Sequence, residues 1–546
     1  MRSNTKTTVG SYLVTRLEQM GLGHVFGVPG DYVLGFYDLL EASDIKVIGT
    51  CTEIGAGYAA DAYARVNGLG AVCVTYCVGG LNAVNAVAGA YAEKSPLVVI
   101  SGAPGTNERV RSPLLHHRVR TFETQLRIYE QVTAAAVALD DPRTVPMLVD
   151  SALDTCVREK RPVYLELPRD LVSAPCAAPG PHRPVQPHSD RASLDEAVAE
   201  AVALLSRARR PVILAGVELH RFGLQAPLLR LVERTGYPVA ATLLGKSVIS
   251  ERHPRYLGIY EGAMGHERVR RAVENADRVL ILGAFMTDIN LGIYTARLDP
   301  ARTIYAHSGT VAIGHHHYDD VFLGHFIARI ADARLPRRRT AVPRAAAPLP
   351  FRPHSGDHIT MRRLFARLDQ FLDDDTVVIC DIGDSLFGGA DLTIHRRTEF
   401  LSPAYYASMG FSVPAALGAQ IADMRRRPLV IVGDGAFQMT GQELSTITQH
   451  RLNPIVLVLN NKGYTTERAI HDGPYNNISG WAYHRWPDIL GDGWGCEVRT
   501  EDELEDALRK AQAHTSSFSI INVQLDPLDC SPALIRLGRR LARKVK

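Results

Sequence analysis

Short apolar runs alternate with longer amphipathic segments along most of the chain. Runs such as PLVVISGAP (96–104), RPLVIVGDG (427–435) and PIVLVLNN (454–461) are typical of strands buried on both faces. Between them lie helix-length amphipathic segments such as LDEAVAEAVALLSRA, residues 194–208. This alternation predicts an α/β protein with parallel sheets flanked by helices. Ligands bind such sheets at the carboxyl ends of strands, so the residues just after each apolar run are the first candidates for a site.

Two proline-rich segments divide this pattern into three parts. Residues 173–190 and 335–353 hold five prolines each, and polar segments of this kind are extended and seldom lie inside a core. We therefore expect three domains, at residues 1–175, 190–335 and 354–546. The length of 546 residues agrees with this division, since it suggests about three or four domains.

Composition and charge narrow the class of partner. Hydrophobic residues make up 46% of the chain and charged residues 22%, which are ordinary values for a globular protein. The net charge of +3 offers no basic excess for nucleic acid, so a small charged molecule is the expected partner. The uncharged stretch 66–92 is interrupted by asparagines and glycines, which favours a buried α/β segment over a membrane span.

The cysteines and the N-terminus indicate a cytoplasmic protein. Eight cysteines are sparse for this length, and they contain no second close pair that would complete a zinc ribbon. A set of reduced thiols is the simplest interpretation. Arg16 and Glu18 lie where a signal peptide would need an apolar run.

A strand, a glycine turn and a helix at residues 427–447 mark the first candidate site. Gly433 and Gly435 allow a ligand to approach the backbone, and the start of the following helix favours an anion. Asp434 between them would repel a phosphate unless a cation lies in between. The next strand ends at Asn461, so Asp434, this amide oxygen and a backbone carbonyl could bind Mg²⁺ together with a diphosphate. A glycine turn beside an unrelated polar strand end is the alternative.

The order GDG, then 24 residues, then NN resembles the thiamin diphosphate (ThDP) binding motif. From GVPGDY near the N-terminus to the last helix, the chain resembles the ThDP-dependent 2-oxo acid decarboxylases of the pyruvate and indolepyruvate group, and it is most similar to phenylpyruvate decarboxylases. The resemblance implies a pyrimidine-binding first domain, a structural central domain and a diphosphate-binding last domain. It implies ThDP and Mg²⁺ as cofactors, with Asp434, Asn461 and the carbonyl of Gly463 as metal ligands.

The resemblance also implies a set of residues that contact the cofactor. They are Glu53, Gly383, Asp384, Ser385, Ala407, Met409, Gly433, Gly435, Ala436 and Phe437. Glu53, in the Gly/Ala-rich segment CTEIGAGYAADAYAR, would keep the pyrimidine ring protonated, and Met409 would bend the cofactor. A charge at a helix start and an ordinary core methionine are the alternatives. Ala407 stands where relatives have glycine, and its backbone carbonyl would face the pyrimidine amino group.

A further set would supply protons after CO₂ has left and would release the aldehyde. Its members by resemblance are Asp31, His116, His117 and Glu467, each of which taken alone is more often structural. Carboligases of the acetolactate synthase type lack this set, so the resemblance favours decarboxylation. Two histidines at 315 and 317 could share one side of a strand, but no companion motif supports a metal there.

The expected activity is therefore non-oxidative decarboxylation of a 2-oxo acid to an aldehyde and CO₂. Phenylpyruvate and indolepyruvate are the favoured substrates. Alternatives are a pyruvate or branched-chain 2-oxo acid decarboxylase, a ThDP-dependent carboligase, and a catalytically silent ThDP-binding regulator. We expect neither nucleic acid nor a membrane as a partner. The resemblance implies a homodimer as the smallest active unit, paired into a homotetramer.

Overall fold

The chain forms two compact units in the computed structural model. The model describes residues 7–181, 185, 187–338, 340–343, 350–395 and 399–545, with side chains up to residue 538. Unit 1 comprises Met1–Gln186, Tyr406–Arg425 and Thr440–Leu452, and unit 2 comprises Pro187–Tyr405, Arg426–Met439 and Asn453–Lys546. In the parts that are described, the predicted linkers 173–190 and 335–353 contain no helix or strand.

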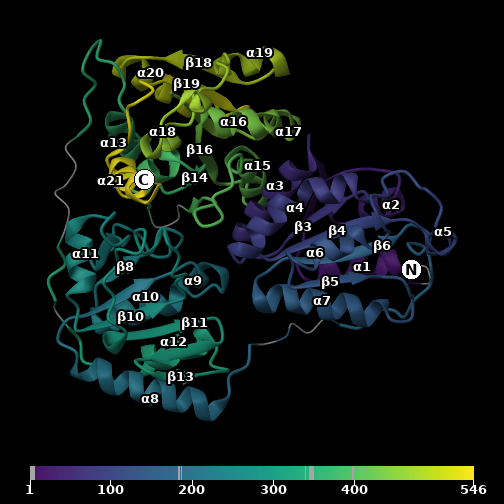
Figure 1. Ribbon diagram of the computed structural model, residues 1–546, viewed down its shortest axis with the longest axis horizontal. Coiled ribbons are helices and arrows are strands. Elements are labelled where there is room, and N and C mark those ends of the chain that lie inside the picture. Colours follow the sequence, from purple (N-terminus) through teal and green to yellow (C-terminus); the bar gives the residue numbers. More distant parts are fainter. Residues whose placement is uncertain are drawn as a thin grey trace. The chain divides into compact units, whose positions relative to one another are not determined.

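Unit 1 is built on a six-stranded parallel sheet with the order β2-β1-β3-β4-β6-β5. Figure 1 labels β3, β4, β5 and β6 of this sheet. Its strands are His24–Val28 (β1), Lys46–Gly49 (β2), Gly70–Val74 (β3), Leu97–Ala103 (β4), Ala135–Ala138 (β5) and Val163–Pro168 (β6). Its N-terminal helices are Val9–Gln19 (α1), Leu34–Glu41 (α2), Glu53–Asn67 (α3), Val78–Ala92 (α4), Thr106–Arg111 (α5), Thr124–Tyr129 (α6) and Val145–Glu159 (α7). Every residue of β3, β4 and β6 is buried, as predicted for strands covered on both faces.

The uncharged stretch 66–92 forms the end of α3, then β3 and α4, which confirms the predicted α/β segment. Within the part of the chain that is described, no helix has both the length and the apolar character that crossing a membrane would require.

The central sheet lies in unit 2 and has the order β13-β12-β11-β10-β7-β8-β9. Its strands are Pro211–Ala215 (β7), Val239–Ala241 (β8), Tyr256–Ile259 (β9), Arg278–Leu282 (β10), Thr303–His307 (β11), Thr310–Ile313 (β12) and His316–Tyr318 (β13). Its helices are Arg191–Arg207 (α8), Glu218–Arg221 (α9), Gln225–Thr235 (α10), Glu267–Glu274 (α11), Pro300–Arg302 (η1) and Leu323–Asp332 (α12).

The last two strands of this sheet depart from the predicted parallel arrangement. β12 pairs antiparallel with β11 and with β13, because the turns between these strands are too short for a parallel crossover. The histidine-rich segment forms this edge. His316 and Tyr318 both hydrogen-bond Glu200 of α8, so a salt-bridged edge strand accounts for it.

The third sheet, also in unit 2, has the order β15-β14-β16-β17-β19-β18, and all its pairs are parallel. Its strands are Thr376–Cys380 (β14), Phe400–Leu401 (β15), Arg427–Gly433 (β16), Ile455–Asn460 (β17), Trp494–Val498 (β18) and Ser519–Gln524 (β19). Its helices are Met361–Phe371 (α13), Asp384–Gly389 (α14), Asp434–Thr440 (α16), Thr465–Ile470 (α18), Pro474–Asn476 (η3), Tyr483–Arg485 (η4), Trp486–Leu490 (α19), Glu501–Ala513 (α20) and Pro532–Val545 (α21). Counted within each sheet, the strand order is the same as in unit 1.

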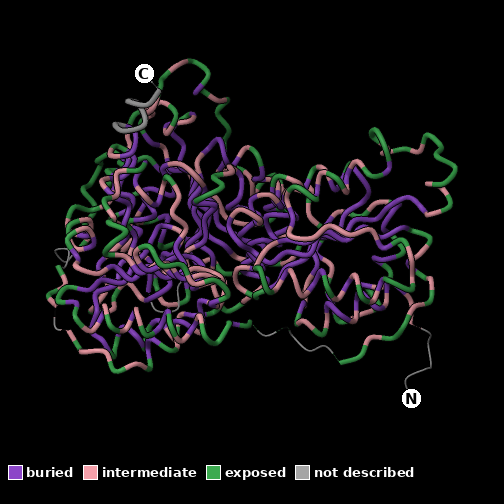
Figure 2. Tube along the Cα trace, turned by 60° about the horizontal axis from the view of Figure 1, so that its bottom comes forward, coloured by how far each residue is buried: buried purple, intermediate pink, exposed green. Residues whose placement is uncertain are grey.

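Three helical segments from the last third of the sequence pack into unit 1. They are Ser412–Ala422 (α15), Gly441–Glu443 (η2) and Leu444–Gln449 (α17). Nearly all of α15 is buried. Buried stretches of the chain run through the interior of the trace, and exposed stretches lie mostly on its outside (Figure 2). α15 packs against α3 so closely that a Cβ added at Gly418 would lie 1.8 Å from the carbonyl oxygen of Ala59. Glycine at position 418 is therefore needed for this helix packing.

Replacing Gly418 with alanine should destabilise unit 1, because the backbone carbonyl that it would meet cannot move aside. We expect a loss of about 1–3 kcal/mol or more, seen as a lower apparent melting temperature. Gly49→Ala is the matched control, since a Cβ at Gly49 would meet nothing within 4 Å. Equal melting temperatures for the two variants would contradict this account of the α3–α15 contact.

Candidate active site

Asp434 and Asn461 lie at the ends of two neighbouring strands. β16 ends at Gly433 and β17 at Asn460, and the two strands pair so that Gly433 lies opposite Leu459. Asp434 is only 1% exposed, and its carboxylate accepts hydrogen bonds from the N–H of Gly435 at 2.8 Å and of Gly463 at 3.1 Å. Burial raises the pKa of Asp434 to about 6, against the opposing effects of its backbone hydrogen bonds and of the charge of Arg468.

The side chain of Asn461 offers a second oxygen at these strand ends. Its Oδ1 atom is buried and has no hydrogen-bond partner within the described structure. An unsatisfied buried acceptor of this kind costs roughly 1–3 kcal/mol, which a bound cation would offset. The carbonyl of Gly463 accepts from Thr465 N at 3.1 Å and keeps a second lone pair. These hard oxygens fit Mg²⁺, so the structure brings the predicted metal ligands together.

Gly463 is held in a conformation that only glycine takes without strain. Its φ is +146°, and a Cβ there would lie 2.0 Å from the carbonyl oxygen of Asn476. Arg468 fixes the same turn by donating to the carbonyls of Asn461 at 3.1 Å and Lys462 at 2.9 Å. The glycine conformation and the hydrogen bonds from Arg468 therefore hold the turn that presents the Gly463 carbonyl.

The predicted diphosphate-binding turn is the first turn of α16. Gly435, Ala436 and Phe437 follow Asp434 there, where helical N–H groups have no intrahelical acceptor and favour an anion. The Phe437 side chain is fully buried and packs edge-on against Tyr483 and Trp486. Only the backbone of Phe437 is therefore available to a diphosphate.

Gly383, Asp384 and Ser385 follow β14, which pairs with β16, so they lie at the same edge of the sheet. The Asp384 carboxylate accepts from the backbone N–H of Ser531 at 2.7 Å and from its hydroxyl. This pair anchors the start of α21, and burial raises the pKa of Asp384 to about 6. The side chain of Asp384 thus has a structural partner, which the sequence did not indicate.

Ala407 and Met409 lie in a segment held within unit 1. Ala407 has φ +61°, a left-handed conformation that costs a non-glycine residue roughly 1–2 kcal/mol and explains why glycine suits this position. Between them, Ser408 contacts the Tyr58 hydroxyl at 2.6 Å and accepts from Asn85 at 2.8 Å. Met409 is half-buried.

Glu53 is the first residue of α3, as predicted, and is half-buried. Thr52 caps the helix by accepting from Gly55 N at 3.1 Å, and Asn82 of α4 donates to Glu53 Oε2 at 2.6 Å. The carboxylate is therefore oriented by the two helices that follow β2 and β3.

Sequence reasoning missed Glu443, which fixes the turn before Glu53. This buried carboxylate accepts from the N–H groups of Cys51 and Thr52, each at 3.2 Å, and from the Thr446 hydroxyl at 3.0 Å. Burial raises its pKa. Nothing in the local sequence distinguishes Glu443 from an ordinary residue near a helix start, because its partners lie about 390 positions earlier.

Asp31, His116 and His117 lie together in unit 1. Asp31 follows β1, the two histidines lie between α5 and α6, and ligand atoms of all three residues lie within 4.8 Å of one another. His116 Nε2 is 2.8 Å from Asp31 Oδ2, and the rings of His116 and His117 meet edge-on at 4.7 Å. The Tyr32 hydroxyl donates to the backbone carbonyl of His116 at 3.2 Å. The structure therefore joins residues about 85 positions apart into one potential proton-transfer group.

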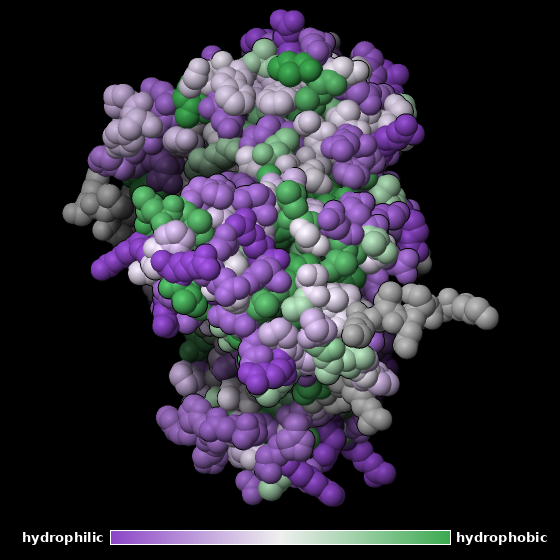
Figure 3. All heavy atoms as spheres, turned by 90° about the vertical axis from the view of Figure 1, so that its right-hand side faces the viewer, coloured by the Kyte–Doolittle hydropathy of each residue, from purple (hydrophilic) through white to green (hydrophobic). Residues whose placement is uncertain are grey.

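The segment with the two histidines is exposed, as predicted. Val110, Leu114 and Val119 on the same segment are 86%, 93% and 62% exposed. Figure 3 views the molecule from the right-hand side of Figure 1, where α5 is labelled. Hydrophobic residues lie between hydrophilic ones on this face. Glu467, the remaining member of the predicted proton-transfer set, belongs to unit 2, where it lies exposed on α18.

Three family models match the chain. They describe the N-terminal TPP binding domain (residues 7–126), the central domain (198–333) and the C-terminal TPP binding domain (381–523) of thiamine pyrophosphate enzymes. Among curated relatives, the indole-3-pyruvate decarboxylase of Azospirillum brasilense is 37% identical over 94% of this chain and 94% of its own length. The probable pyruvate decarboxylase Pdc101 of Schizosaccharomyces pombe is 33% identical over 98% of this chain and 96% of its own length. The alpha-keto-acid decarboxylase of Mycobacterium avium is 36% identical over 97% of this chain and 96% of its own length.

Substitution of two adjacent asparagines should separate cofactor binding from folding. Asn461→Ala removes an acceptor that has no partner, so we expect an unchanged melting temperature without ligands and at least about tenfold weaker binding of ThDP with Mg²⁺. Asn460→Ala breaks a buried hydrogen bond to Asn522, so it should lower the melting temperature yet keep the stabilisation by ligands. Thermal melts with and without ThDP and Mg²⁺ measure both effects. Wild-type ligand binding by Asn461→Ala would rule out this metal site.

Proposed function

The chain belongs to the ThDP-dependent 2-oxo acid decarboxylases, and from this premise we propose how its residues serve the reaction and which acids it takes. It is a carboxy-lyase that decarboxylates a 2-oxo acid with ThDP and, as is usual in the family, Mg²⁺. The observation that carries the residue assignment is the buried carboxylate of Asp434 beside the unpartnered amide oxygen of Asn461.

We assign cofactor binding to the strand ends of the third sheet. Asp434, Asn461 and the Gly463 carbonyl would hold Mg²⁺, and the first turn of α16 would hold the diphosphate through backbone N–H groups. Gly383 and Ser385 would contact the cofactor from the neighbouring strand end. Ala407 and Met409 keep their predicted roles at the pyrimidine amino group and at the bend of the cofactor.

Bound ThDP supplies the electron sink that allows the bond to the departing carboxylate to break. Glu53 would hold a proton at the pyrimidine N1′ atom, and Asn82 would keep the carboxylate aimed by its hydrogen bond at 2.6 Å. Glu443 would act on the reaction through the position of Glu53, because it fixes the turn that precedes α3. We therefore class Glu443 as a positioning residue.

The pair formed by Asp31 and His116 would move the proton that replaces CO₂ on the product carbon. Their 2.8 Å contact allows a proton to pass between imidazole and carboxylate, and the exposed position allows exchange with water. His117, with ring nitrogen Nδ1 buried and unpartnered among the described contacts, would bind the substrate. Glu467 would assist this proton transfer from α18, the helix that follows the proposed metal ligands Asn461 and Gly463.

Aromatic 2-oxo acids are the substrates that we favour, with phenylpyruvate and indolepyruvate first. The resemblance to phenylpyruvate decarboxylases supports this choice, and so does the 37% identity to an indole-3-pyruvate decarboxylase. The relatives named for pyruvate make pyruvate the competing substrate.

We also propose a homodimer as the smallest active unit, paired into a homotetramer. Residues assigned to the pyrimidine end, such as Glu53 and Asp31, lie in unit 1, and the metal ligands lie in unit 2. In the family these two groups come together from two chains, which supports the proposal. The free state of all eight cysteines supports a cytoplasmic, reducing compartment.

Product analysis should identify both the reaction and the substrate. With phenylpyruvate we expect aldehyde and CO₂ in equal amounts, and a kcat/KM at least about tenfold above that for pyruvate, since each buried apolar group adds binding energy. Hydroxyketone in place of aldehyde would indicate a carboligase. A higher kcat/KM with pyruvate would overturn the aromatic assignment and leave the decarboxylase assignment intact.

Glu53→Gln tests the proposed proton donor. We expect decarboxylation to slow by at least about a hundredfold, because a positioned acid–base group contributes that much, while ThDP still binds through the Mg²⁺ ligands. Hydrogen–deuterium exchange at C2 of bound ThDP, followed by NMR, should slow in parallel. Glu41→Gln, on the exposed face of α2, is the control. Exchange at the wild-type rate would remove Glu53 from this role.

A further inference from the structure

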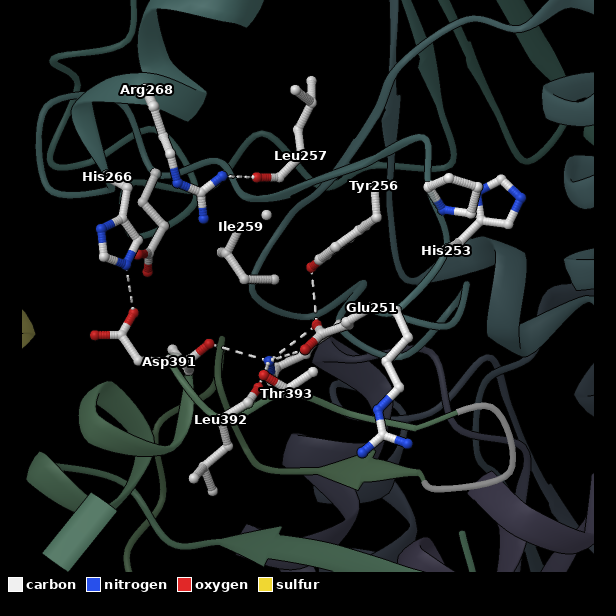
Figure 4. A pocket seen from close by; sticks show the side chains of 16 residues that line it. Glu251, His253, Tyr256, Leu257, Ile259, His266, Arg268, Asp391, Leu392 and Thr393 are labelled. Carbon is white, nitrogen blue, oxygen red and sulfur yellow. Dashed lines mark hydrogen bonds and ion pairs between the residues drawn. The ribbon is translucent and has the colours of Figure 1, made fainter. Parts of the chain in front are cut away.

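A second pocket lies wholly within unit 2, and none of its lining residues belongs to the candidate active site. Its volume is about 460 Å³, and its walls come from residues 246–268 and 390–393 (Figure 4). This volume is in the range of small-molecule sites, about 300–1,000 Å³.

One wall is held by Lys246, which is only 1% exposed. Its ammonium donates to both carboxylate oxygens of Glu251, at 2.9 and 2.8 Å, and to the carbonyls of Ala390 at 3.0 Å and Leu392 at 2.6 Å. The Tyr256 hydroxyl donates to the same carboxylate at 2.8 Å. Lys246 and Glu251 thus neutralise each other and tie the two segments together, so neither offers its charge to a ligand.

The opposite wall is acidic. Glu261 is 6% exposed, and its Oε1 atom has no hydrogen-bond partner in the part of the chain that is described. Burial and the charge of Asp391 raise the pKa of Glu261 to about 7, against the opposing effects of Arg536, His266 and Lys246. Asp391 accepts from His266 Nε2 at 2.9 Å through one oxygen. This wall therefore needs a hydrogen-bond donor, preferably a cation.

A cationic and an apolar group complete the lining. Arg268 donates through Nη1 to the carbonyl of Leu257, and Figure 4 shows another guanidinium nitrogen directed toward the enclosed space. The side chain of Ile259 and the ring of Tyr256 lie between this guanidinium and Glu251 in the same view. The pocket thus offers a carboxylate pair, a guanidinium and an apolar surface within one small volume.

We propose that this pocket binds a free α-amino acid with an apolar side chain. The ammonium would lie on Glu261 and Asp391, the carboxylate on Arg268, and the side chain along Ile259 and Tyr256. A 2-oxo acid has a keto oxygen in place of the ammonium, so it offers Glu261 no hydrogen-bond donor and the acidic wall no positive charge, and it fits less well. A metal ion is disfavoured too, because among the described residues the only metal-spaced cluster is Asp31, His116 and His117.

The test is calorimetric titration of the holoenzyme with three probes. We expect L-phenylalanine to bind one site per chain. Phenethylamine lacks the carboxylate and 3-phenylpropionate lacks the ammonium, so each should bind at least about tenfold more weakly, as one lost charged contact implies. Equal binding of 3-phenylpropionate would overturn the role of the acidic wall. Absence of binding by L-phenylalanine would overturn the proposal.

Glu261→Gln locates the site. It should weaken L-phenylalanine binding at least about tenfold, whereas Glu267→Gln, an exposed glutamate on α11, should leave binding unchanged. Near pH 7 Glu261, with a pKa of about 7, is partly protonated. An ammonium beside it lowers this pKa, so binding to the wild type should release a fraction of a proton per site. Titrations in buffers of different ionisation enthalpy measure this release, and Glu261→Gln should abolish it. Unchanged affinity and proton release in Glu261→Gln would rule out this pocket. These readouts do not depend on which 2-oxo acid is decarboxylated.

Discussion

The proposed chemistry depends on one constraint: a buried carboxylate and an amide oxygen, which has no hydrogen-bond partner among the described residues, follow two neighbouring strands. Asp434 and Asn461 are placed together because β16 and β17 pair in parallel and end at the same level of the sheet. Burial disfavours the charged form of Asp434, and the Oδ1 atom of Asn461 has no hydrogen-bond partner among the described residues, so both groups cost free energy. Binding of a metal ion and a diphosphate at these strand ends would offset this unfavourable free energy.

In both units, the assigned residues lie just after the ends of adjacent parallel strands. The first and third sheets share one strand order, and in each the assigned residues follow adjacent parallel strands. Asp31 follows β1 and Glu53 follows β2, just as Asp434 follows β16 and Asn461 follows β17. Parallel strands bring the starts of successive connections to one edge, so short segments far apart in sequence supply one site.

Buried polar residues outside the proposed reaction hold these segments in place. Glu443 fixes the turn before Glu53, Ser531 holds Asp384, and Lys246 ties the central sheet to the segment after α14. Each is satisfied by several hydrogen bonds, which is the condition for burying a charge at tolerable cost. Among the described residues, the Oε1 atom of Glu261 has no hydrogen-bond partner, and this difference is why we propose a ligand beside it.

The sequence by itself determined the alternation of strands and helices, the positions of Asp434 and Asn461 directly after two strands, and the helix that begins at Glu53. These features depend on local periodicity and on glycine turns, which act over a few residues. Only the tertiary structure decided the antiparallel edge formed by β12 and β13, the packing of α15 against α3 and the partners of Glu443 and Glu261. Those outcomes depend on contacts between segments that are tens to hundreds of residues apart in the sequence. A local pattern in the chain does not determine which distant segments pack together.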